Sequence, residues 1–139
     1  MLHVAKAHVG VTIVGDLTTA DHIPSNSFDC IILTQTLQLI YDVHAAVATV
    51  YRILKQGGVA LVTVPSITKV SGYDQERWGH YWNFTTQSAQ RLFEEHFPAT
   101  NIQVVAYGNV LTAVAFLHGL AIEELSRKDL DYLTLNTQC

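Results

Sequence analysis

Residues 27–65 constrain the fold more than any other stretch of the chain. Two short apolar runs, at residues 30–33 and 59–64, flank an amphipathic run at residues 43–54. Short runs rich in β-branched residues are typical of strands that are buried on both faces. The middle run carries its apolar residues at helical spacing, so one stripe of a helix can face the strands. A strand, a helix and a second strand with short connections predict a βαβ unit whose strands are parallel.

The two ends of the predicted helix carry recognisable capping residues. Asp42 precedes the amphipathic run, where a carboxylate can accept hydrogen bonds from the free N–H groups of the first turn. Lys55 is predicted to lie in the last turn, and Gly57-Gly58 to supply the left-handed residue that ends the helix.

The rest of the chain is expected to extend or cover this unit. Further strands are predicted at residues 9–14 and 102–106, and a helix is predicted to begin at Thr85 and end at His96, before Pro98. Residues 110–125 predict a strongly apolar helix that should be covered on more than one side. The fold class is therefore α/β, with about four mostly parallel strands and flanking helices.

Composition narrows the class of protein. The 139 residues suffice for one domain, 1–139, and with 49% hydrophobic and 14% charged residues the chain is globular. A net charge of −4 without a basic run argues against nucleic-acid binding. No apolar run of membrane-spanning length and no signal-peptide layout is present, so we expect a soluble cytoplasmic protein. The two cysteines, Cys30 and Cys139, are too few for a disulfide scaffold, and Cys30 is expected to be buried in its strand. The histidines are not spaced as metal ligands are, so no metal ion is expected.

Several sequence motifs occur in an order that matches a known family. The motifs are GDL at residues 15–17, IPSNSFDCIIL at 23–33 and YRILKQGGVALVTVP at 51–65, with fitting spacing, followed less specifically by RWGHYWNFT at 77–85 and AQRLFEEHF at 89–97. In these motifs the chain resembles the class I S-adenosylmethionine-dependent methyltransferases, in particular the methyltransferase type 11 group. The resemblance implies a partial Rossmann-like methyltransferase sheet and S-adenosylmethionine as cofactor.

The resemblance also implies positions that contact the cofactor. In the family, the residue matching Asp16 hydrogen-bonds the adenine amino group, and the backbone N–H at Leu17 meets a ring nitrogen. Thr34 and Gln35 follow a strand at the position that lines the cofactor and substrate space. The alternatives remain open that Asp16 only forms a turn and that Thr34 and Gln35 are polar residues at the solvated end of a strand.

Residues 66–84 show no clear period, and a loop of this length is usually functional. One hypothesis is a lid over a small-molecule substrate, in which aromatic rings supply flat contact area and an arginine pairs with an anionic group. Alternatively, the aromatic residues pack into the core or bind a partner chain. His80 is a candidate proton acceptor, or a surface residue. The candidate substrate-binding residues are Tyr73, Arg77, Trp78, Tyr81 and Trp82.

Other family features are absent from the sequence. No G-x-G-x-G occurs in the chain, although in the family such a glycine-rich turn holds the methionine moiety of the cofactor. Gln38 and Tyr41 stand where relatives often carry paired histidines. The chain aligns with the C-terminal half of the family fold, so we expect a domain truncated at its N-terminal side.

Three functional hypotheses follow. The first is a truncated methyltransferase-like protein that is not catalytically competent alone and that self-associates, most simply as a homodimer, to cover apolar surface at residues 9–14. The second is an active methyltransferase, or a subunit of one, whose missing half is supplied by another segment. The third is a small-molecule or protein-binding module built as a homo-oligomer.

Overall fold

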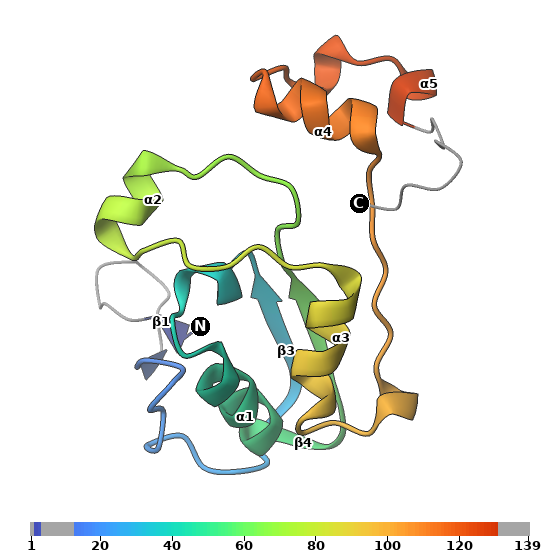
Figure 1. Cartoon of the computed structure of the whole chain (residues 1–139). Helices are drawn as coiled ribbons and strands as arrows, with labels where there is room; N and C mark the ends of the chain where they lie inside the picture. The colour runs from blue at the N-terminus through green and yellow to red at the C-terminus, as the bar shows by residue number, and fades with distance from the viewer. Residues whose placement is uncertain (1, 4–12, 131–139) are drawn as a thin grey trace.

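The computed structural model describes residues 2–3 and 13–130 (Figure 1). Strand β3 (Phe28–Thr34), helix α1 (Val43–Ile53) and strand β4 (Leu54–Thr63) form the predicted βαβ unit. The two strands are parallel, with Ile32 opposite Leu61. The central prediction from the sequence is therefore confirmed.

Helix α1 begins as predicted but ends differently. The Asp42 carboxylate accepts a hydrogen bond from the Ala45 N–H at 3.0 Å, so the N-cap is confirmed. The prediction that Lys55 and Gly57 end the helix is wrong, because the chain is already extended at Leu54. Lys55 lies in β4, and Gly57, at a φ of 78°, lies where the pairing of β4 with β3 shifts register.

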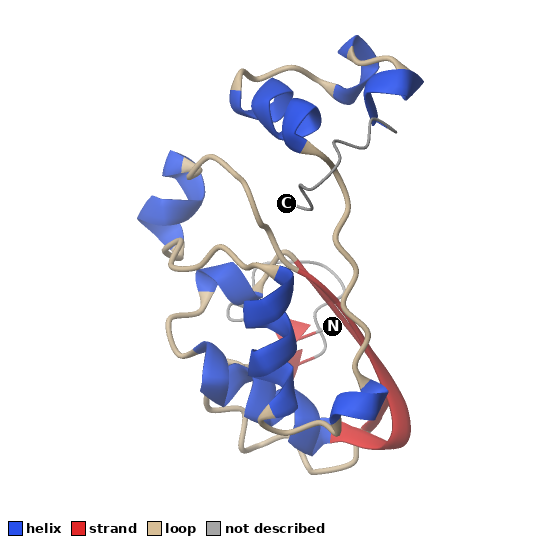
Figure 2. Ribbon diagram, turned by 45° about the vertical axis from the view of Figure 1, so that its right-hand side comes forward, coloured by secondary structure: helices blue, strands red, loops and turns tan. Residues whose placement is uncertain are grey.

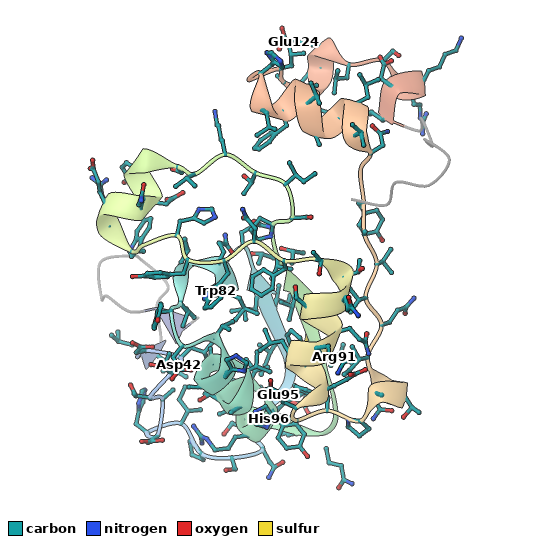
Figure 3. The ribbon with its side chains drawn as sticks, in the orientation of Figure 1. Asp42, Trp82, Arg91, Glu95, His96 and Glu124 are labelled. Atoms are coloured by element: carbon teal, nitrogen blue, oxygen red, sulfur yellow. The ribbon has the colours of Figure 1, made fainter. Side chains whose placement is uncertain are left out.

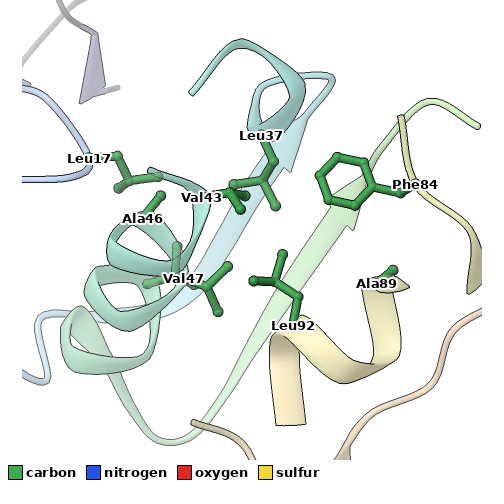
Figure 4. Close-up of a cluster of buried hydrophobic side chains, with 9 residues drawn as sticks. Leu17, Leu37, Val43, Ala46, Val47, Phe84, Ala89 and Leu92 are labelled. Atoms are coloured by element: carbon green, nitrogen blue, oxygen red, sulfur yellow. The ribbon is translucent and has the colours of Figure 1, made fainter. Parts of the chain in front are cut away.

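One face of the β3–β4 sheet is covered by two helices, α1 and α3 (Thr86–Glu94), which lie on the same side of the strands (Figures 1 and 2). The sheet supplies alternate residues such as Leu33 and Val62 to this layer, as expected for side chains that alternate between faces. The buried residues of this cluster are Leu17, Leu37, Val43, Ala46, Val47, Val50, Phe84, Ala89 and Leu92 (Figure 4).

The opposite face of the same sheet is exposed. Ile32 keeps 68% of its surface, Leu61 56% and Val59 53%, and Cys30 is also exposed. The prediction that these strands are buried on both faces, and with it the burial of Cys30, is wrong. The reason is that the described helices that pack on the sheet, α1 and α3, do so from one side.

The remaining strands differ from the predicted single sheet. β1 (Leu2–His3) and β2 (Ile13–Val14) form a separate parallel pair, so the described residues form two two-stranded sheets in place of one sheet of about four strands. Of the strand predicted at residues 9–14, only Ile13 and Val14 lie in the described range. Residues 102–106 run extended but pair with no strand among the described residues, so that strand prediction is wrong.

Short helices fill the connections. These are η1 (Leu37–Leu39) after β3, α2 (Gly72–Arg77) inside the predicted long loop, and η2 (Ala99–Asn101) after α3. Helix α3 has the predicted Thr85 as its N-cap, whose side chain forms a capping box with Ser88, and it ends at Glu94, before the predicted His96.

The predicted helix over residues 110–125 is shorter than expected. α4 (Val110–Leu117) ends in a Schellman motif, in which Gly119 has a φ of 85° and the Leu120 N–H donates to the Ala115 carbonyl at 3.0 Å. The chain continues through η3 (Ile122–Glu124) and α5 (Arg127–Leu130). This α4–α5 unit lies apart from the sheet, at the end of the extended segment (Figures 1 and 2). No described helix is long and apolar enough to cross a membrane.

Candidate functional site

A pocket of about 250 Å³ opens beside the carboxyl end of β3, where ligands bind in open α/β sheets. Its walls come from the segment after β3, the segment after β4 and the start of α2. The lining residues are Gln35, Gln38, Leu39, Pro65, Thr68, Lys69, Ser71, Asp74 and His80. The pocket therefore brings together two residues that the sequence analysis selected separately, Gln35 and His80.

Gln35 connects the ends of the two strands. Its N–H donates to the Thr63 carbonyl at 2.9 Å, and its side-chain amide lies 3.4 Å from the Thr63 hydroxyl. Its φ of 47° is in the left-handed region, which is uncommon for a residue other than glycine, asparagine or aspartate. Such conformations cluster at ligand sites, where the surrounding contacts hold them in place.

Gln38 carries the most informative polar atom of the pocket. The side chain is 7% exposed, and its Nε2 donates to the Gln35 Oε1 at 3.4 Å. Its own Oε1 is buried and has no hydrogen-bond partner among the described residues. Leaving a buried acceptor unpaired costs roughly 1–3 kcal/mol, so such an atom calls for an explanation.

The other polar groups of the pocket have mixed charge. His80 is half-buried, and its Nε2 lies 3.3 Å from the Asn83 Oδ1, so one ring nitrogen is already engaged. Lys69 and Asp74 supply one positive and one negative side chain. This set suits a small polar molecule that carries hydrogen-bond donors.

The other predicted cofactor positions lie outside this pocket. The Asp16 Oδ1 accepts hydrogen bonds from the Thr18 N–H and hydroxyl, both at 2.8 Å, and the Leu17 side chain is part of the core. Thr34 lies on the exposed face of the sheet, next to Gln35. The carboxylate of Asp16 thus forms a turn, while its role towards adenine stays a prediction.

The predicted aromatic lid separates into two groups. In the first, on α2, the Arg77 guanidinium lies 3.6 Å from the centroid of the Tyr73 ring, which meets Trp78 edge to face at 6.0 Å. These side chains contact one another and do not line the pocket.

The second group packs beside the start of α1. Tyr81 and Trp82 contact the Tyr41 ring, with centroids 5.3 and 6.3 Å apart. The indole N–H of Trp82 donates to the Ile40 carbonyl at 3.0 Å, so this ring fixes the loop to the segment before the helix (Figure 3). A packing role for Trp82 therefore accounts for its position.

A larger groove of about 1180 Å³ runs along the free edge of β4, bounded by α3 and residues 101–107. Its walls are mostly apolar side chains and strand backbone, and none of the predicted site residues lines it. Among the residues that the structure describes, no group of three histidine, cysteine or acidic side chains is placed to hold a metal ion.

Four polar pocket residues, Thr68, Lys69, Ser71 and Asp74, were missed by the sequence analysis, although they follow β4 at its carboxyl end. The pocket is smaller than the roughly 300–1,000 Å³ of typical ligand sites, and no G-x-G-x-G occurs in the sequence.

Comparison with known sequences agrees with the βαβ unit. Residues 1–62 match the profile of a family that is described as "Methyltransferase domain". The matched residues include β3, α1 and most of β4. A search of curated proteins returned no match. Residues 1–62 are therefore similar to a methyltransferase domain of the S-adenosylmethionine-dependent class I type.

Proposed function

We propose that this chain is a methyltransferase-like domain that binds a small polar molecule in the strand-end pocket and does not transfer methyl groups by itself. The observation that carries the proposal is the buried Oε1 of Gln38, an acceptor that no described residue pairs with, in a pocket next to the left-handed Gln35.

The chemistry of the pocket defines the ligand class. The Gln38 Oε1 accepts, so the ligand must present an N–H or O–H group to it. Asp74 favours a cationic donor and Lys69 an anionic group, and the small volume restricts the ligand to a few heavy atoms or to one end of a larger molecule.

The geometric requirements of methyl transfer argue against catalysis by this chain alone. The reaction requires the nucleophile and the methyl group to be held in line, with water excluded. Without a glycine-rich turn, the backbone N–H groups that hold the methionine end of the cofactor are lacking in this chain. The cofactor would be bound too weakly for its methyl group to be positioned.

A thermal-shift titration tests the catalytic part of the proposal. A site with a Kd near 10 µM would stabilise the fold by about 2.7 kcal/mol at about 1 mM ligand, which raises Tm by several degrees. We expect no such rise with S-adenosylmethionine or S-adenosylhomocysteine. A clear rise with either compound would contradict the proposal.

Substitution of Gln38 tests the pocket. Gln38→Met keeps the volume and removes the unpaired acceptor, so we expect unfolding free energy to stay equal or to rise by up to about 2 kcal/mol. The exposed Gln103→Met is the matched control and should change little. A loss of stability in Gln38→Met would show that the amide is structural and would remove the observation on which the proposal rests.

Binding itself is measured with two probes, methionine and adenosine, which are the two ends of the cofactor. Amide chemical shifts of Gln35, Gln38 and His80 should move with at least one probe in the natural chain and with neither in Gln38→Met. Absence of any shift with both probes at about 10 mM would argue against a ligand pocket.

A second candidate function is favoured by the family match over residues 1–62. In this alternative the chain is a subunit of an active methyltransferase, and another polypeptide supplies the glycine-rich turn. A tagged chain would then co-purify with that polypeptide, and only the complex would release S-adenosylhomocysteine from S-adenosylmethionine.

A further inference from the structure

Two apolar surfaces of this chain are left uncovered by the residues that the structure describes. The first is the open sheet face, formed by Cys30, Ile32, Val59 and Leu61 on the side of β3 and β4 away from α1 and α3. The pairs Cys30–Val59 and Ile32–Leu61 lie side by side across the two strands, so the four side chains form one patch. Parallel strands are normally covered on both faces, which makes this patch unusual.

The second surface is a stripe on α4. Val110, Val114 and Leu117 recur at helical spacing with Leu111 beside them, and between 41% and 49% of each residue is exposed. Helix α4 buries one residue, Ala115, and contains no charged residue. The helix is nonetheless well built, because Asn109 caps it through a capping box and also donates to the carbonyls of Asp129 and Leu130.

We propose that α4 of a second copy of this chain packs on the open sheet face, and that the exchange is reciprocal. Each copy then contributes one helix and receives one, which gives a closed two-fold dimer. The proposal concerns the side of the sheet away from α1 and α3 and does not depend on the ligand pocket.

The accessible surface area of the chain supports a second copy as the partner that covers the open sheet face. The chain exposes 9855 Å², whereas a compact monomer of its 15.4 kDa mass exposes about 7,200 Å². The excess is about 2,700 Å² per chain, or about 5,400 Å² for two chains, which is at the upper end of the total surface that obligate dimers bury. A reciprocal exchange of α4 removes surface at two contacts per dimer, so it offsets part of this excess.

The arrangement within one chain indicates that the helix on the open sheet face is α4 of a second copy and not the chain's own α4. Residues 102–108 are extended and carry α4 away from the sheet (Figures 1 and 2). None of the residues that form the two surfaces is charged, and Asp29, which precedes Cys30 in β3, pairs with Lys55 at 2.8 Å. Two uncharged apolar surfaces on one chain satisfy each other when two chains meet.

Charge substitutions on each surface test the proposal on the full chain, with mass measured by light scattering after gel filtration. At about 50 µM we expect the natural chain to elute as a dimer. Leu61→Glu on the sheet face and Leu117→Lys on α4 should each weaken the dimer at least 100-fold, because each buries an unpaired charge. A mixture of the two variants should recover part of the dimer, since one of its two contacts then pairs opposite charges.

The matched control is Val70→Glu, which places a charge on an exposed apolar residue outside both surfaces and should leave the dimer intact. Far-ultraviolet circular dichroism checks that each variant is folded. Leu117→Lys keeps the test valid if Leu61→Glu does not fold, because α4 lies outside the core of the sheet. A natural chain that is monomeric at this concentration, or variants that stay dimeric, would overturn the proposal.

Disulfide trapping identifies which copy supplies the helix. Cys30 is on the sheet face, so Leu117→Cys in a Cys139→Ser background should form a disulfide between chains, visible as a dimer on a non-reducing gel. Leu111→Cys and Val114→Cys sample the neighbouring positions of the stripe. A disulfide within one chain at all three positions would show that α4 covers its own sheet, and this would contradict the second copy as the occupant.

Discussion

Helices α1 and α4 show how differently two parts of this chain are stabilised. The apolar stripe of α1 is fully used, with Ala46, Val47 and Val50 at 0% exposure against the sheet. In α4 the apolar residues surround the helix, and Ala115 is the residue that it buries. A helix with one apolar stripe is satisfied by one neighbouring layer, whereas a helix that is apolar all round requires several.

The sheet region and the α4–α5 unit carry equally strong helix-capping signals. Helix α3 on the sheet and helix α4 beyond it both begin with a capping box, Thr85 with Ser88 and Asn109 with Thr112. Short isolated helices are marginal in water even when well capped. The difference between the regions is therefore one of tertiary burial, and stability should be unequally distributed along the chain.

The largest expected effect comes from a core truncation. Leu37 is 0% exposed, so Leu37→Ala should lower the free energy of unfolding by about 2–5 kcal/mol in urea titrations followed by circular dichroism. Ile122→Ala, at a position that is 64% exposed, is the control and should change the free energy of unfolding little when the protein concentration is sub-micromolar. Equal losses in both variants would mean that the α4–α5 unit is as tightly packed as the sheet.

The next effect concerns the loop that precedes β3. The Arg52 guanidinium donates hydrogen bonds to the carbonyls of Ile23 at 2.6 Å and Ala20 at 2.8 Å. Methionine has no N–H group in its side chain, so both carbonyl oxygens lose this donor in Arg52→Met. We expect a loss of about 1–3 kcal/mol and faster amide exchange in residues 17–27. The exposed Arg91→Met is the control; an unchanged exchange rate in Arg52→Met would show that water replaces the guanidinium without cost.

A pair of cap substitutions compares the two regions directly. Thr85→Ala and Asn109→Ala each remove a capping side chain worth about 1 kcal/mol. The first should lower the global Tm, because α3 is part of the core. At sub-micromolar concentration, where the proposed dimer dissociates, the second should leave the Tm almost unchanged and speed hydrogen exchange only in α4. A drop in Tm for Asn109→Ala would indicate that α4 unfolds together with the sheet.

The smallest effect is expected at the ion pair beside the sheet. Lys55 lowers the pKa of Asp29 by a hydrogen bond and by its charge, relative to the ordinary value of 3.8. A carboxyl whose pKa is lower in the folded state stabilises the fold above pH 3.8, and this contribution is lost as pH falls through the lowered value. Both groups are solvent-exposed, so Asp29→Asn should lower Tm only slightly at pH 7. At pH 2, or in about 1 M salt, the variant and the natural chain should be indistinguishable by calorimetry.

The parts of the fold that sequence predicts well are those fixed by local chemistry. Asp42 and Thr85 mark helix starts because their side chains bond to N–H groups three residues away. Periodicity identifies the strands and the buried stripe of α1. It does not show whether a second layer exists, so the exposure of Ile32 and Leu61 was not predictable from a run of apolar residues.

The site was predicted only in part, for a similar reason. Gln35 was selected because it follows a strand, and His80 because it lies among aromatic residues, but their shared pocket depends on how the loop after β4 folds back. The missed pocket residues belong to that loop, which shows no period. The aromatic residues were selected as one group, yet Tyr73 and Trp82 contact different partners.

Gly58 has a consequence for how such a sequence can change over generations. A Cβ atom there would lie 2.9 Å from the Asp29 carbonyl oxygen and 3.0 Å from that of Lys55, so any other residue would displace backbone. Selection for folding alone would keep this glycine, whether or not the chain retained any chemistry. A family signature that includes it therefore records ancestry of the scaffold, and inheritance of the reaction must be judged from other positions.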